Sequence, residues 1–216
     1  MHIIESSLKL AGVTLPIKSV VYSENDRTVL ISPVPDLEKF KEKIDAVGEI
    51  TDIVAPSGFH HMGVKKAKSL YPNAKLWASP ALKEKRPDIA WDLYLGEHDW
   101  PLKDFTPYLV GGMPKVQEFV FFHAPSKTLV VWDLVFNILE GSGFMHFLFF
   151  KGFGTYKRFA MSRFFKSFIK DKEEFERSMH PLFKLDFESL VMAHGTPLNE
   201  NAKEQMLAAL LERGFR

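Results

Sequence analysis

Two adjacent histidines, an aspartate and a third histidine each follow a short apolar segment within a few residues. In chain order they are His60, His61, Asp133 and His194. Neutral imidazole is the commonest metal ligand in proteins. Imidazoles combined with one carboxylate suit zinc, iron or manganese better than calcium or magnesium. The four side chains therefore predict a metal site, provided that the fold brings them together.

The apolar segments before these residues have the composition of buried strands. They cover residues 50–55, 128–132 and 190–193. When such strands lie side by side, the residues at their ends face a common cleft, where ligands collect. We therefore expect these three strand ends to be close in space.

Each of these polar residues also has a purely structural interpretation. Asp133 could cap a helix that begins at Leu134, and His194 could be an ordinary turn residue before Gly195. Adjacent histidines are most often surface or helix-capping residues. The three features together are more specific than any one of them, but this alternative stays open.

The remaining segments alternate between strand and helix patterns. Antiparallel hairpins inside each half indicate layered α/β or α+β packing, with helices covering the sheets. Without an internal repeat or linker, we expect a single domain over residues 1–216. Further strands are expected at residues 2–10, 17–23, 28–32, 74–78, 108–110 and 116–122, and helices at residues 37–47, 64–71, 80–85, 144–172, 171–181 and from 199 onward.

Composition excludes several classes of function. The chain has 216 residues, of which 46% are apolar, and this suits one domain with a sizeable core. Its 28 basic and 27 acidic residues give no charge argument for a nucleic-acid partner. The lack of cysteine excludes disulfides and thiolate ligands. With no secretory signal and no apolar run near ~20 residues, a cytoplasmic location is expected.

The order of these elements resembles the metallo-β-lactamase fold superfamily over nearly the whole chain. The likeness is closer to an uncharacterised branch known only as a domain of unknown function. Residues 53–63 stand where the family has its H-x-H-x-D-H motif, residues 128–133 resemble the strand of the bridging aspartate, and residues 191–195 resemble the final His-Gly motif. The resemblance implies an α+β fold, a four-layer αββα sandwich with the site at one edge of the sheets.

The family motif is incomplete at its first metal position. Matching His61 to the last histidine of the motif places His60 at the aspartate, and Pro56 and Gly58 then fall at the first two histidines. The next family histidine should lie near residues 111–113, which contain none. The resemblance therefore implies at most one metal ion.

The second metal position keeps three of its family residues, and His60 replaces the motif aspartate. His61, Asp133 and His194 are expected to hold one zinc or iron ion, with His60 as a weaker ligand because consecutive side chains rarely point at the same ion. Glu118 and His123 are candidates for a second shell or a substrate contact. Replacement of the motif aspartate leaves no clear general base, so it stays open whether the protein is an enzyme at all.

An aromatic and basic segment follows the aspartate. Thirteen of the 20 Phe lie between residues 136 and 187, and seven Lys or Arg lie within residues 151–172. Apolar and basic residues recur every four positions over residues 151–170, which predicts a basic amphipathic helix. Such a helix could contact a membrane surface, cover an apolar substrate, form a homodimer interface or simply pack on the core.

Three hypotheses of function follow from these patterns. The first is a single-metal hydrolase acting on an unidentified small-molecule substrate. The second is a non-catalytic family member that binds a small molecule or a partner. The third is a peripheral membrane protein that uses the helix at residues 151–170. Metal content separates the first two, and vesicle binding tests the third.

Overall fold

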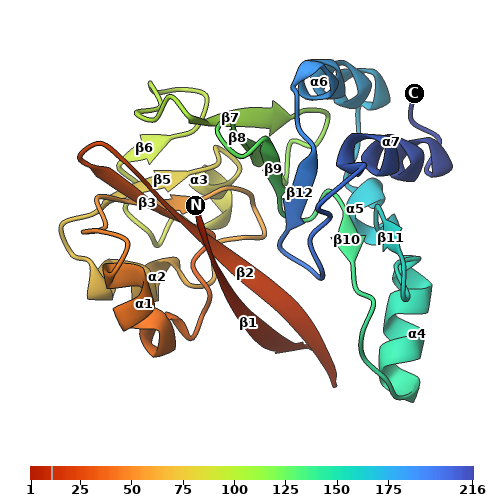
Figure 1. Cartoon of the computed structure of the whole chain (residues 1–216), viewed down its shortest axis with the longest axis horizontal. Helices are drawn as coiled ribbons and strands as arrows, with labels where there is room; N and C mark the ends of the chain where they lie inside the picture. Colours follow the sequence, from red (N-terminus) through yellow and green to blue (C-terminus); the bar gives the residue numbers. More distant parts are fainter. Residues whose placement is uncertain (11) are drawn as a thin grey trace.

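Runs of β-branched and aromatic residues form two sheets that share one central core (Figure 1). The structure, a computed structural model, describes residues 1–10 and 12–216. The first sheet has six strands, in the order β1 (His2–Leu10), β2 (Val13–Glu24), β3 (Arg27–Ile31), β4 (Asp52–Ala55), β5 (Lys75–Ala78) and β6 (Leu93–Tyr94). The second has four, in the order β12 (Ser189–Met192), β9 (Thr128–Val131), β8 (Glu118–His123) and β7 (Phe105–Val110). A short pair is formed by β10 (Phe136–Asn137) and β11 (Phe159–Ala160).

Strand direction changes within each sheet, and this decides which strand ends meet. In the first sheet β1, β2 and β3 are antiparallel, whereas β3 to β6 run parallel. In the second sheet β12 and β9 are parallel, and the pairs β9–β8 and β8–β7 are antiparallel. The carboxyl ends of β9 and β12 therefore lie next to each other.

Helices cover the outer face of each sheet, which gives the expected four-layer αββα sandwich. The first sheet packs against η1 (Leu37–Phe40), α1 (Lys41–Asp45), α2 (Val64–Leu70) and α3 (Leu82–Lys85). The second packs against α5 (Arg163–Ser167), α6 (Lys172–Lys184) and α7 (Ala202–Glu212). A smaller cluster joins α4 (Phe144–Phe153) to β2 and β10. Among the described residues, no helix is long and apolar enough to cross a bilayer.

Two tryptophans anchor the core between the sheets. Trp77 and Trp132 are almost fully buried, and each indole N–H has an acceptor. Trp77 donates to Asp52 Oδ1 at 2.8 Å, and Trp132 donates to the Phe119 carbonyl at 2.8 Å. Because these polar atoms are satisfied, the two large rings can be buried without the cost of an unpaired donor.

The helix expected over residues 144–172 is wrong. The chain leaves α4 at Gly154, which has φ +72°, forms β11, and begins α5 after Ser162. Gly154 ends α4 in the left-handed conformation that glycine adopts readily, and the Ser162 hydroxyl accepts from the Phe165 N–H as a new N-cap. The aromatic and basic stripes of residues 151–170 therefore do not share one helix face.

Smaller differences concern the boundaries of elements. The helix expected at residues 37–47 is divided into η1 and α1 and ends at Asp45. β6 and the start of β7 lie within residues 86–107, where no strand was expected. α6 continues to Lys184 beyond Pro181, where we expected it to end. None of these differences moves a strand that carries a candidate site residue.

Gly63, before α2, lies against the chain that follows β3. A Cβ atom at this position would be 2.1 Å from the Pro33 carbonyl oxygen and 2.6 Å from that of Val34. We expect Gly63→Ala to lower the free energy of unfolding by about 3 kcal/mol, because backbone cannot yield as a flexible side chain does. Gly152→Ala, within α4 and with no atom within 4 Å, should instead add up to about 1 kcal/mol. Denaturant unfolding of both variants measures the difference, and equal stabilities would contradict the close packing.

Candidate metal centre

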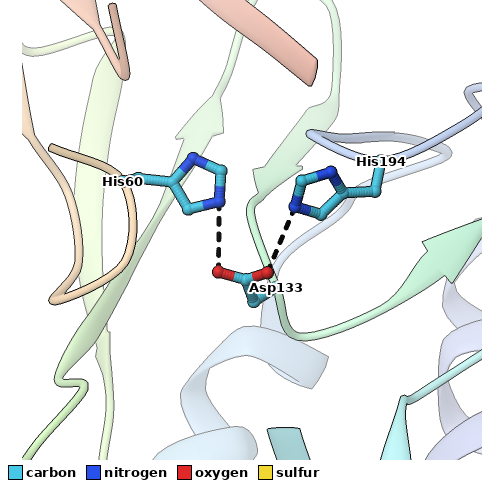
Figure 2. A group of neighbouring side chains, drawn as sticks. All are labelled: His60, Asp133 and His194. Carbon is cyan, nitrogen blue, oxygen red and sulfur yellow. Dashed lines mark hydrogen bonds and ion pairs between the residues drawn. The ribbon is translucent and has the colours of Figure 1, made fainter. Parts of the chain in front are cut away.

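Three side chains converge from three strand ends (Figure 2). His60 lies in the loop after β4, Asp133 follows β9 and His194 follows β12. Asp133 Oδ2 is 3.1 Å from His60 Nε2, and Asp133 Oδ1 is 3.2 Å from His194 Nε2. One ligand atom from each residue lies within 4.8 Å of the others.

The parallel pairing of β9 and β12 sets the positions of two of these residues. Val131 and Met192 are partners in the ladder, and Asp133 and His194 each follow two residues later. His60 comes from the first sheet, so the site lies where the edges of the two sheets meet. The expectation that the three strand ends are close in space is confirmed.

Neighbouring groups fix both imidazole rings. His194 Nδ1 is 2.8 Å from the Pro16 carbonyl oxygen, and Phe136 stacks on the ring at 4.7 Å between centroids. His60 Nδ1 is 2.8 Å from the Ser32 hydroxyl. Because a carbonyl only accepts, His194 Nδ1 must carry a proton. Nε2 is the nitrogen that faces Asp133.

Glu118 holds the backbone around Asp133. Its buried carboxylate accepts the N–H groups of Trp132 at 3.0 Å, Asp133 at 2.9 Å and Leu134 at 3.3 Å. Burial and the nearby charge of Asp133 raise the pKa of Glu118 to about 8, although the three backbone donors act in the opposite direction. Glu118 therefore positions the aspartate without reaching the open side of the cluster.

The donor set fits a metal cation. Asp133 Oδ2 is buried, and among the described residues its close polar neighbour is His60 Nε2 at 3.1 Å. Burial opposes ionisation of Asp133, but the charge of His60 and the hydrogen bond from His194 keep its pKa well below the ordinary value. A metal cation could take the place of the protons between these groups, because a neutral imidazole ligates through the nitrogen lone pair and the carboxylate is already ionised.

The sequence matches no family model and no curated protein, but its fold has solved counterparts. The metallo-β-lactamase from Pontibacter korlensis aligns with a TM-score of 0.68 at 14% identity, over 97% of this chain and 94% of that one. This chain has the metallo-β-lactamase fold. The enzyme from Hirschia baltica gives 0.66 at 10% identity, over 96% and 92%. FIM-1 from Pseudomonas aeruginosa, in a mono-zinc form, gives 0.65 at 11% identity, over 99% and 92%.

The sequence predicted that His61 would face the cluster and that His60 would be the weaker ligand, and the structure reverses these two positions. The structure places His60, rather than His61, beside Asp133 and His194. His61 Nδ1 is instead 2.8 Å from an Arg86 guanidinium nitrogen. Burial and the charges of Arg86 and Lys85 lower the pKa of His61 to about 4. Consecutive residues in the turn after β4 point in different directions, and the sequence did not show which of the two would face the cluster.

The two candidates for a second shell separate in the structure. Glu118 begins β8, next to the cluster, whereas His123 ends the same strand. Five residues of strand span about 17 Å at ~3.4 Å per residue. His123 Nδ1 is 2.6 Å from the Ser126 hydroxyl, and its ring packs edge-on against Tyr22 and Phe105. His123 therefore lies at the far end of the sandwich. The expectation that it supports the site or contacts a substrate there is wrong.

Sequence reasoning missed three groups around the site. Ser32 directly follows β3, so the rule of polar residues at strand ends could have found it. Lys18 has a side chain only 4% exposed within the apolar strand β2, and its ammonium donates to the Gly195 carbonyl. A lysine in an otherwise apolar strand was the available signal. The Pro16 carbonyl gave none.

Proposed function

We propose that this protein is a hydrolase-like enzyme that works with one metal ion, zinc or iron, held by His60, Asp133 and His194. The observation that carries the proposal is the Asp133 carboxylate between two fixed imidazoles, with one ligand atom of each residue within 4.8 Å of the others. Three protein ligands with a position left for water are typical of catalytic zinc sites. A bound ion of this kind lowers the pKa of its water to about 7 and supplies hydroxide at neutral pH.

The residues of the chain divide the remaining work. Ser32 and the Pro16 carbonyl orient the two imidazoles, so that one nitrogen of each faces Asp133. Glu118 fixes the backbone of Asp133. Replacing a group that hydrogen-bonds a metal ligand typically lowers metal affinity by about 10- to 100-fold. A small-molecule substrate would enter from the side that Glu118 does not occupy.

The packing of two glycines supports a single ion. A Cβ atom at Gly58 would be 2.8 Å from the Lys115 carbonyl oxygen, and one at Gly112 would be 2.2 Å from the Asp171 carbonyl oxygen. Backbone therefore fills the space that side-chain ligands at these positions would need. Resemblance to the family placed first-site histidines at or near both positions.

Elemental analysis of protein purified without added metal or chelator tests the proposal. About one equivalent of zinc or iron, lost on chelation together with any hydrolytic activity, would support it. A folded protein with an intact cleft and no affinity for either metal would favour the non-catalytic alternative. We also propose a cytoplasmic location, with which the cysteine-free sequence is consistent.

A peripheral membrane contact is a second proposal, and the surface that supports it is α4 rather than residues 151–170. Phe144 is 74% exposed and Leu148 53%, and Met145 and Phe147 are also exposed. We expect the double variant Phe144→Ser, Leu148→Ser to weaken co-sedimentation with phosphatidylcholine–phosphatidylserine vesicles by about 100-fold, since each side chain contributes ~1.5 kcal/mol or more when buried. The matched control is Leu207→Ser, Leu211→Ser on α7.

Two outcomes would contradict the membrane contact. Unaltered protein that stays in the supernatant at low salt would remove it. A change from dimer to monomer in the α4 variant, measured by analytical ultracentrifugation without lipid, would assign the same surface to a homodimer.

A further inference from the structure

A pocket of about 380 Å³ opens directly from the His60–Asp133–His194 cluster. It lies between the β1–β2 hairpin on one side and α4 and α5 on the other. The hairpin contributes Leu8, Leu10 and Leu15, and the helices contribute Phe149, Phe153 and Phe164. Its size falls within the range of ~300–1,000 Å³ of small-molecule sites.

The pocket has a polar end and a long apolar wall. Lys18 lines it beside the cluster, close to His194 through the contact with Gly195. Along the hairpin, Lys18 pairs with Glu5, Leu15 with Leu8, and Val13 with Leu10. Five residues of β2 therefore separate the polar end from the hairpin tip, a distance of about 17 Å at ~3.4 Å per residue.

The apolar wall continues to the surface. Leu10, Met62 and Phe164 line the pocket and are also 47%, 53% and 47% exposed. A mouth of this kind can admit an alkyl chain without burying polar groups. A compact polar substrate would leave the aromatic wall without a partner.

Charge at the inner end indicates the kind of head group. Lys18 contributes a cation, which it shares with the exposed Glu5 carboxylate at 3.5 Å, and a bound metal would outweigh the single carboxylate of Asp133. A carbonyl or carboxylate group is therefore favoured there over an ammonium group.

We propose that the substrate is a single-chain acyl ester. Its alkyl chain lies along the hairpin and α4, and its carbonyl reaches the cluster. This rests on the proposed function, because the cluster is taken as the reacting end. Hydrolysis forms a bond from the water oxygen to the acyl carbon and breaks the bond from that carbon to the alkoxy oxygen. The alcohol leaves with one proton of the water, and the fatty carboxylate leaves its proton to solvent.

The product carboxylate provides the binding test. Titration calorimetry of the full chain with octanoate, decanoate and dodecanoate, below their micelle concentrations, should show one site per chain. Each added methylene should tighten binding roughly fourfold until the chain reaches the mouth. Dodecyltrimethylammonium should bind at least about tenfold more weakly than dodecanoate, because its head group is cationic.

Variants at the mouth separate a pocket from general stickiness. Leu10→Ala should weaken dodecanoate more than octanoate, because Leu10 lies at the hairpin tip, which only the longer chain approaches. Leu211→Ala, which removes an equally exposed apolar side chain on α7, should change neither. Several equivalents of dodecanoate per chain, no dependence on chain length, or equal effects of the two variants would overturn the proposal.

The same titration on chelated protein separates this inference from the metal proposal. If the protein takes up no metal but still binds carboxylates with an affinity that depends on chain length, the apolar pocket is supported and the proposed metal enzyme is refuted. Metal-dependent hydrolysis of acetyl and dodecanoyl 4-nitrophenyl esters at equal kcat/KM would do the opposite. Activity that rises with chain length and is lost on chelation is the result expected if both hold.

Discussion

Replacing His194 by alanine should reduce metal affinity by at least about 100-fold. The imidazole is held by the Pro16 carbonyl and by Phe136, so its free nitrogen is already directed at Asp133. Loss of a ligand should cost no less than the ~10–100-fold typical of loss of a supporting contact. His60→Ala should have a similar effect, contrary to the weaker role that the sequence suggested. Competition with a chromophoric chelator measures the affinities.

His61→Ala is the matched control for this series. It removes the neighbouring imidazole, which contacts Arg86 and not the cluster, and should change metal affinity by less than about threefold. If His61→Ala releases the metal and His60→Ala does not, the side-chain placement in the loop is wrong. Two tightly bound equivalents per chain would refute the single site.

Glu118→Ala should be among the most destabilising substitutions in the molecule. It leaves three backbone N–H groups without their acceptor in the interior, at roughly 1–3 kcal/mol for each unsatisfied group. We expect a loss of about 4 kcal/mol, a large part of the ~5–15 kcal/mol that stabilises a typical domain. Denaturant unfolding of the metal-free protein measures it.

Glu118→Gln is informative because it keeps the shape of the side chain. One amide oxygen can still accept, but the amide nitrogen would face an N–H donor, so we expect a loss of about 2 kcal/mol. Glu188→Ala removes an exposed carboxylate paired with Lys127 and should cost under ~0.5 kcal/mol. A Glu118→Ala variant as stable as Glu188→Ala would show that the buried carboxylate does not hold this backbone.

The sequence predicted the strands that carry the site better than the side chains that face it. Apolar runs before Asp133 and His194 were sufficient, because parallel neighbouring strands must end at one edge. His60 and His61 could not be told apart, because loop conformation decides which of two adjacent residues faces inward. His123 also ends a strand, but β8 runs antiparallel to β9, so its carboxyl end lies at the opposite edge.

The error over residues 144–172 has a different origin. Gly154 and Ser162 are residues that often end and begin helices, but apolar and basic residues at every fourth position predicted one continuous helix. This helical periodicity corresponds to two short helices, α4 and α5, and not to one long helix. Tertiary contacts of α4 with β2 and of α5 with the second sheet then set the break.

The pairing of β9 with β12 also has a consequence for the order of assembly. Asp133 and His194 are 61 residues apart in the chain, and the segment between β9 and β12 includes α4, α5 and α6. Closing so long a loop costs entropy before any contact compensates for it, and distant pairings of this kind form slowly. We therefore expect the metal ligands to meet late in folding, so that an ion would secure the finished sandwich rather than nucleate it.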